Sequence, residues 1–530
     1  MAKYKPGLQA ESGQAAVQEP IVSKAEVSQS EQDMIYTVKG GSILMFGRLV
    51  NTVSRFVITF VLARMLGAED YGLYNLAITA ATIAGAISVF GLDTTLTRYI
   101  AIMNVRQDKA GIWGVIQVGI GFSLLLSVLF ATALFALAYP ISISIFHEPR
   151  LAPLLQVASL VVPFLTLSDV LAGATRGFKN MADSVIAQNI VQPLLRLVLI
   201  VIAAVGGLSL PMTILIFGIA DFAASLVLVY FLNRHFNLLR SLAQGKRNSR
   251  EILGFSLPLW LSDLLTTFRS NIQTLLIGSL DSIRGVGIFS IANQVNLMSN
   301  IFHTSMSQTA KPLIAELNDQ GAHKRIEQMY QTITRWVVTL NMPIILIIIL
   351  FPSPIMGIFG KSFAAGAPAL AIMGLVNFVN VATGMCGTVL DMTGHTRMKL
   401  ANTIVRVSVG ILANFMLIPR WGITGAAMAA LIHEIVSNAL PLVELWFLYR
   451  ILPYSWAFLK PLTAGIVAAG VALFVRFRLP VSDDLISILL QMVVVVGVYL
   501  LVIQLLGLSI EERKMVNRLR RRAIGLFSAH

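Results

Sequence analysis

Long apolar segments constrain the fold of this chain more than any other feature of its sequence. Stretches long enough to cross about 30 Å of hydrocarbon recur from residue 40 to residue 507. Only helices or closed barrels satisfy all backbone polar groups inside a bilayer, and apolar runs of this length are typical of helices. The predicted segments are 40–64, 71–100, 113–140, 151–175, 183–207, 210–232, 252–279, 285–310, 328–357, 364–390, 398–419, 422–449, 455–478 and 483–507. The sequence therefore predicts an all-α, polytopic membrane protein with about fourteen transmembrane helices.

The charge composition supports a membrane protein and argues against a nucleic-acid-binding protein. Charged residues make up 12% of the chain, about half of the fraction that is usual in soluble domains. The net charge of +14 would suit a nucleic-acid-binding protein, but the Lys and Arg residues are scattered through short loops between apolar segments. Such scattering is how membrane topology is set, so we expect no nucleic-acid partner. The single cysteine, Cys386, cannot form an internal disulfide.

The loop charges also predict the orientation. Lys and Arg residues in one set of alternating loops outnumber those in the other set by about three to one, which places the first set in the cytoplasm. Both termini then lie on the cytoplasmic side of the inner membrane. Residues 1–38 are polar and are predicted to be a disordered cytoplasmic tail. The basic tail 508–530 is predicted either to lie on the anionic leaflet as an amphipathic helix or to be a simple basic flank.

Two parts of the chain resemble each other. The stretch 71–77 recurs as 286–292 at an offset of 215, and Arg55 has a counterpart in Arg269 at an offset of 214. The sequence thus predicts two copies of a six-helix unit, an N-lobe at 39–237 and a C-lobe at 238–450, with two further helices at 451–507. Because six is even, both copies start on the same side of the membrane and form parallel repeats.

Polar stripes run along three of the predicted helices. On the first, Arg48, Asn51, Thr52, Arg55 and Thr59 are spaced so that they share one helix face. A charged residue at membrane depth costs at least about 2.5–3.5 kcal/mol, so this face should meet protein or a water-filled cavity rather than lipid. The seventh helix carries a similar stripe around Arg269. The eighth carries Asn293, Asn296, Asn300, His303, Ser307 and Lys311.

These stripes allow two interpretations. One is structural: polar side chains that hold helices together through ion pairs and hydrogen bonds. The other, which we favour for the stripes, is a hydrated cavity. Basic residues outnumber acidic ones among these candidates, and arginine binds phosphate in bidentate fashion, so the expected cargo is anionic. The predicted substrate-binding residues are Arg48, Arg55, Arg269, Asn293, Asn296, Asn300 and Lys311. Candidates for ion coupling are Asp169, Asp221, Asp263 and His303.

The sequence favours a transporter over an enzyme. It contains no phosphate-binding glycine loop, no zinc-protease motif and no nucleophile elbow, and its histidines lack metal-ligand spacing. We therefore predict no catalytic residue, metal or cofactor. The best argument for an enzyme is the acidic pair Glu69-Asp70 in the first outer loop. The predicted outer loops are only about five to ten residues long, which leaves little room to hold a sugar acceptor.

Two stretches resemble signatures of a known family. LARMLGAEDYGLYNLA at the first helical hairpin and LIPRWGITGAAMAALI at 417–432 resemble those of polysaccharide-transport (O-antigen-type) flippases. This family belongs to the multidrug/oligosaccharidyl-lipid/polysaccharide exporter superfamily, and the resemblance covers nearly all of 39–507. The second copy departs from the first: Val286 stands where the first has Tyr71, and no Glu-Asp pair precedes it.

The resemblance implies a function and a site. Such flippases move undecaprenyl-diphosphate-linked oligosaccharides, including lipopolysaccharide precursors, across the cytoplasmic membrane by alternating access between two lobes. Arg48 and Arg55, with Arg269, match the placement of cavity arginines that hold the diphosphate in related lipid II flippases. The last two helices would form a groove for the lipid tail. Implied partners are the lipid-linked oligosaccharide, the membrane, and a polysaccharide polymerase with glycosyltransferases. A lipid II or multidrug exporter, and a membrane-embedded glycosyltransferase or polymerase, remain alternatives.

Overall fold

The computed structural model describes residues 24–178, 180–236, 249–478 and 485–507, and every regular element among them is helical. The first part of the chain forms α1 (Lys24–Val89), α2 (Leu92–Val105), α3 (Lys109–Pro140), η1 (Ile141–Ile145), α4 (Leu151–Ser159), α5 (Val162–Gly177), α6 (Met181–Val185), η2 (Ile186–Val191), α7 (Gln192–Gly206) and α8 (Leu210–His235). The second part forms α9 (Ser249–Leu280), α10 (Ile283–Ser299), α11 (Ile301–Asp319), α12 (His323–Leu350), α13 (Pro352–Phe359), η4 (Lys361–Gly366), α14 (Ala367–Thr383), α15 (Cys386–Met392) and α16 (Thr396–Tyr449). The last elements are η5 (Trp456–Phe458), α17 (Leu459–Arg478) and α18 (Leu485–Leu505).

The all-α membrane fold is confirmed, while the count of fourteen crossings stays a prediction. Within the described residues, ten helical stretches are long and apolar enough to cross a membrane. Two of these, of 60 and 53 residues, each contain a glycine with a non-helical backbone, Gly67 (φ 75°) and Gly422 (φ 54°). Positive φ is the conformation that glycine adopts at little cost, so each long helix turns sharply there. The polar helices α9, α10 and α11 are not among the ten.

Three sequence expectations differ from the structure or lie beyond it. Residues 24–38, expected in a disordered tail, belong to α1. The eighth segment, expected as one helix, is divided between α10 and α11 at Asn300, where the backbone tightens and the N–H of Asn300 donates to the carbonyl of Leu297. Residues 1–23 and the basic tail 508–530 lie outside the described residues.

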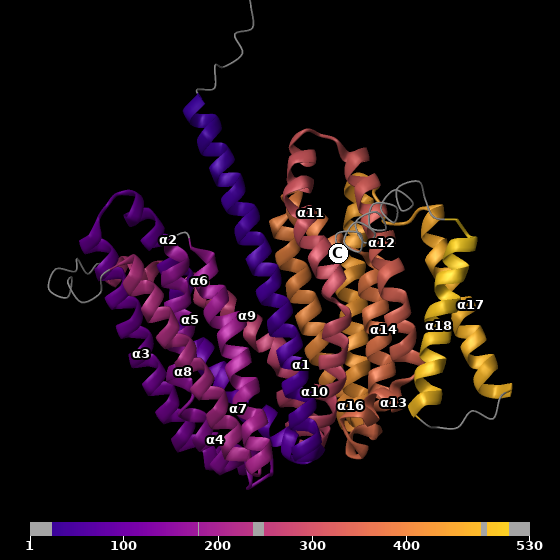
Figure 1. Cartoon of the computed structure of the whole chain (residues 1–530), viewed down its shortest axis with the longest axis horizontal. Helices are drawn as coiled ribbons and strands as arrows, with labels where there is room; N and C mark the ends of the chain where they lie inside the picture. The colour runs from indigo at the N-terminus through magenta and orange to yellow at the C-terminus, as the bar shows by residue number, and fades with distance from the viewer. Residues whose placement is uncertain (1–23, 179, 237–248, 479–484, 508–530) are drawn as a thin grey trace, which may run out of the picture.

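The helices form two groups that converge at one end. In Figure 1, α2 to α8 lie on the left and α10 to α16 at the centre and right, with α1 between them and α17 and α18 at the right edge. The groups approach each other at the lower end of the view, where α1 reverses its direction, and lean apart toward the upper end. The non-helical residue inside α1 is Gly67. We call the lower end the turn end. The exact lobe boundaries stay a prediction, because α9 packs against both α1 and α16.

A close contact between α1 and α10 joins the repeat-related glycines Gly72 and Gly287. A Cβ atom added to Gly72 on α1 would lie 2.0 Å from the carbonyl oxygen of Ile283 on α10. A Cβ atom added to Gly287 would lie 1.9 Å from the carbonyl oxygen of Ala68. Each glycine thus faces the carbonyl four residues before the other. The crossing brings 71–77 and 286–292 together in a symmetric way, and only hydrogen in place of a side chain permits the approach.

Candidate functional site

The polar stripe of the first predicted helix lies on α1 between the two groups. Arg48 and Arg55 are both exposed, whereas Thr59 is buried. Asn51 donates a hydrogen bond of 3.1 Å to Asn189 on η2, so this part of the stripe faces the N-lobe. The hydroxyl of Thr52 donates to the carbonyl of Arg48 in its own helix, which satisfies its polar group locally.

Arg55 lies beside a second arginine rather than beside a counter-ion. Within the described part of the chain, its guanidinium makes no hydrogen bond or ion pair, and it lies within electrostatic range of Arg196 on α7 and of Tyr71 and Tyr74. Arg196 in turn pairs with Asp221 on α8 at 3.1 Å and stacks over the ring of Phe217 at 3.6 Å. The part of the site that contains Arg55 is therefore positively charged.

Arg269 on α9 has the same kind of surroundings in the second lobe. It is exposed and, among the described residues, its guanidinium has no hydrogen-bond or ion-pair partner. It lies within electrostatic range of Arg406 and Glu434, both on α16. One turn further along α9, Gln273 donates to the carbonyl of Ala426 at 2.7 Å, which fixes the orientation of this part of α9 against α16.

The stripe on α10 and α11 turns toward α14 and α15 instead. Asn296 is buried, and Asn300 accepts a hydrogen bond of 3.3 Å from Asn380 on α14. His303 contacts the carbonyl of Gly384 at 3.2 Å, while Asn293 and Lys311 are half-buried. The structure thus places Arg48, Arg55 and Arg269 on exposed faces, but uses part of the asparagine stripe for packing within the second lobe.

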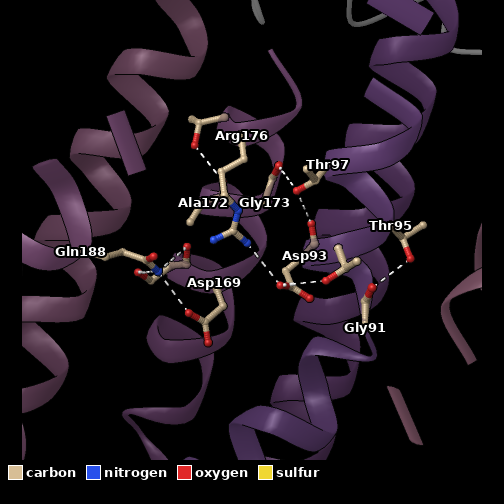
Figure 2. Close-up of polar contacts among 12 residues, drawn as sticks. Gly91, Asp93, Thr95, Thr97, Asp169, Ala172, Gly173, Arg176 and Gln188 are labelled. Carbon is tan, nitrogen blue, oxygen red and sulfur yellow. Dashed lines mark hydrogen bonds and ion pairs between the residues drawn. The ribbon is translucent and has the colours of Figure 1, made fainter. Parts of the chain in front are cut away.

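The carboxylates predicted for ion coupling differ in their surroundings. Asp221 is buried in its ion pair with Arg196, whereas Asp263 is exposed on α9. Asp169 on α5 is exposed to solvent and accepts a hydrogen bond of 3.1 Å from Gln188 on η2, as Figure 2 shows. Beside it, Arg176 pairs with Asp93 on α2 at 3.2 Å.

Sequence reasoning left two groups of residues out of the site. Asp93, which ties α2 to α5, follows the Phe90-Gly91 break and lies in the first turn of its helix, a position typical of a helix start. Arg196 and Arg406, the other group, are not among the predicted substrate-binding residues. Their signal in the sequence is the repeat itself, because both lie on the same helix of their lobe.

A helical bundle with ten stretches able to cross a membrane, and with arginines between its two groups that have no ion-pair partner among the described residues, is typical of a multi-pass membrane transporter. A family model described as "Polysaccharide biosynthesis protein" matches residues 37–318, more than half of the chain, and a MatE model matches residues 258–416. The chain belongs to the polysaccharide biosynthesis protein family, and so to the superfamily that contains the MATE transporters. The predicted family is therefore confirmed.

Individual relatives support this assignment. Stage V sporulation protein B of Bacillus subtilis is 23% identical over 83% of this chain and 90% of its own length. Capsular polysaccharide biosynthesis protein CapF of Staphylococcus aureus is 22% identical over 78% of this chain and 99% of its own. Among solved structures, the lipid II flippase MurJ in an inward closed conformation matches with a TM-score of 0.66 at 14% identity, covering 88% of this chain and 98% of its own. At that identity the match shows the fold alone.

Proposed function

We propose that this chain is a flippase that moves undecaprenyl-diphosphate-linked oligosaccharide from the cytoplasmic to the outer leaflet. The observation that carries the proposal is the set of arginines on the helices between the lobes: Arg48 and Arg55 on α1 and Arg269 on α9. All three are exposed and lack a counter-ion among the described residues. Unpaired guanidinium groups at membrane depth are costly unless a ligand or water compensates them. A diphosphate supplies that compensation through charge-assisted, bidentate hydrogen bonds.

The lobe arrangement supports alternating access. The lobes contact each other at the turn end through the Gly72–Gly287 crossing, and Arg64 of α1 also donates a hydrogen bond of 2.8 Å to the carbonyl of Ile358 at the end of α13. The loop charges predict that this end faces outward, so we infer a state closed on the outer side. Reorientation would be driven by an ion gradient or the membrane potential, with Asp169, Asp221, Asp263 or His303 as the coupling group.

The central experiment reverses one charge. Arg55→Glu should abolish export of the polysaccharide in a deletion strain while the amount of protein in the membrane stays unchanged. Arg325→Gln, at an exposed position near the start of α12, is the matched control and should export normally. Export by Arg55→Glu at the level of the unmodified protein would remove the assignment.

Two further measurements address the cargo and the partners. The lipid-linked precursor that accumulates on the cytoplasmic leaflet of the deletion strain identifies the cargo, and accumulation of lipid II would favour the alternative exporter. Co-purification with a polysaccharide polymerase or glycosyltransferases would test the proposed partners. Reporter fusions at the two termini would test the proposed cytoplasmic orientation of both ends.

A further inference from the structure

Two short connections at the turn end contact the lobe opposite their own. The C-lobe connection consists of α13 and η4, and α13 lies at the turn end in Figure 1. Its Phe359 is 1% exposed and packs edge-on against Phe56 and Phe60 of α1, with ring centroids 5.9 and 6.1 Å apart. Arg64 of α1 donates its hydrogen bond of 2.8 Å to the carbonyl of the preceding residue, Ile358. The C-lobe connection therefore holds the first helix of the N-lobe.

The N-lobe connection, residues 141–150, makes the reciprocal contact. Like its counterpart, it joins the third and fourth helices of its repeat. A Cβ atom added to Gly278 on α9 would lie 3.1 Å from Cδ1 of Phe146, so this ring packs against the bare backbone of the first helix of the C-lobe. Gly278 has the place in its helix that Arg64 has in α1, 214 residues earlier. Each lobe thus places one phenylalanine against the first helix of the other lobe.

The two connections are related by the repeat in sequence and in backbone. Phe146 and Phe359 are 213 residues apart, close to the offsets of 214 and 215 that relate the other repeated residues. The residue after each phenylalanine has a positive φ, 53° at His147 and 139° at Gly360. In both copies, therefore, the helical backbone ends at the phenylalanine or just before it, and the chain changes direction directly after the ring.

An arginine also ties each connection to the first hairpin of its own lobe. Arg150, at the end of the N-lobe connection, pairs with Glu69 at 2.8 Å and with Asp70, both in the turn region of α1. In the C-lobe, Arg284 near the start of α10 lies 214 residues after Asp70 and donates a hydrogen bond of 3.5 Å to the carbonyl of Ser362 on η4. Each connection is thus attached to its own lobe by an arginine and to the other lobe by a ring.

We propose that these residues form two reciprocal clasps, the N-clasp (Phe146, Arg150) and the C-clasp (Phe359, Arg284), which hold the turn end closed and must both release before it opens. The inference is independent of the cargo and rests on the alternating-access part of the proposed function. Because each connection is fixed to its own lobe, separation of the lobes must withdraw each ring from the helix opposite. The apolar contacts of both rings therefore stabilise only the closed arrangement.

The clasps predict changes in the distance between the lobes that packing within one lobe does not. An edge-to-face aromatic pair changes an equilibrium constant by about two- to tenfold. Phe359→Ala loses two such pairs and should shift the equilibrium about tenfold toward the open turn end. Phe146→Ala removes a half-buried ring and should shift it about threefold in the same direction. If the two contacts are independent, the double variant should show the product of the two shifts.

The experiment measures a distance distribution between spin labels in purified, full-length protein without cargo. Val205→Cys near the end of α7 and Trp421→Cys beside the turn of α16 place one label on each lobe at exposed positions. The population at the longer distance should rise in Phe359→Ala, in Phe146→Ala and most of all in the double variant.

Neighbouring apolar residues supply the matched controls. Ile358→Ala and Ile143→Ala truncate exposed side chains on the same two connections and should leave the distances unchanged. Phe359→Leu keeps an apolar side chain and loses only the aromatic pairs, so it should give a smaller shift in the same direction even if Phe359→Ala does not fold. Thermal unfolding measured in parallel separates opening of the turn end from loss of fold.

The outcomes distinguish this inference from the proposed function. If neither phenylalanine variant lengthens the distance while Gly72→Ala does, the clasps are wrong and alternating access stands. If variants of only one connection lengthen it, the reciprocal arrangement is wrong. If no variant changes the distance, Gly72→Ala included, the lobes do not separate at the turn end, and the alternating-access part of the proposed function fails together with the clasps.

Discussion

The Gly72–Gly287 crossing allows a quantitative prediction about the closed turn end. In Gly72→Ala, the new methyl group would lie 2.0 Å from the carbonyl oxygen of Ile283 and 2.9 Å from its carbonyl carbon. Carbon–oxygen contacts between packed helices are about 3.3–3.6 Å, so α1 and α10 must separate by more than about 1 Å. Overpacking of this kind costs about 1–3 kcal/mol. In the proposed alternating-access mechanism the crossing belongs to the state closed at the turn end, so the equilibrium should shift about 5–150-fold toward states open there.

The shift is measurable as a distance between spin labels. Met65 on α1 and Ile358 on α13 are both exposed near the turn end, and the only natural cysteine, Cys386, is buried and should stay unlabelled. Labels at Met65→Cys and Ile358→Cys should show a longer distance distribution in Gly72→Ala than in the parent. Gly287→Ala should act in the same direction, since its methyl group would lie 1.9 Å from the carbonyl of Ala68.

The matched control is Gly121→Ala in α3, where an added Cβ meets nothing within 4 Å. It should leave both the label distances and polysaccharide export unchanged. If Gly72→Ala also leaves the distances and export unchanged, the crossing does not hold the lobes together, and the argument from close packing is refuted.

Three further predictions concern stability and reactivity. Cys386 is 1% exposed, so maleimide reagents should label it only after unfolding, and rapid labelling of the native protein would contradict its burial. Gly384 has a φ of 61°, and a Cβ there would lie 2.1 Å from the hydroxyl of Thr334. Gly384→Ala should therefore destabilise the protein by about 1–3 kcal/mol. The measurement is thermal unfolding followed by tryptophan fluorescence, in which the variant should show a lower midpoint. Arg150 donates to Glu69 and Asp70 on the surface, and the hydrogen bond to Asp70 raises the pKa of Arg150. Even so, Arg150→Ala should lower the free energy of unfolding by no more than about 1 kcal/mol. High salt should shrink this difference between the variant and the parent protein.

The apolar runs and the periodicity of the sequence predicted well those helices, and those helix faces, that depend on composition alone. The apolar runs predicted the positions of the helices. The two signature stretches contain Gly67 and Gly422, the glycines at which α1 and α16 turn. The internal repeat also paired 71–77 with 286–292, which the structure brings into contact. These features are local, or follow from duplication, and so can be seen in a single chain.

The surroundings of each polar face could not be predicted in the same way. The spacing of Asn300 and His303 placed them on one stripe, but their partners Asn380 and Gly384 come from about 80 residues further along the chain. A helical stripe looks the same in the sequence whether it meets water or another helix. For the same reason the sequence could not show that Asp221, a candidate for ion coupling, pairs with Arg196.

The amino-acid sequence by itself determined that this chain is a helical membrane protein of two parallel repeats, because the energy of burying backbone and charge in hydrocarbon leaves few other solutions. It also predicted which arginines lie at membrane depth. Only the tertiary structure decided which of these keep a counter-ion: Arg196 meets Asp221, whereas Arg55 and Arg269 have no ion-pair partner among the described residues. That difference depends on contacts between helices far apart in the chain, since electrostatic energy is set by distance in space rather than by position in the sequence.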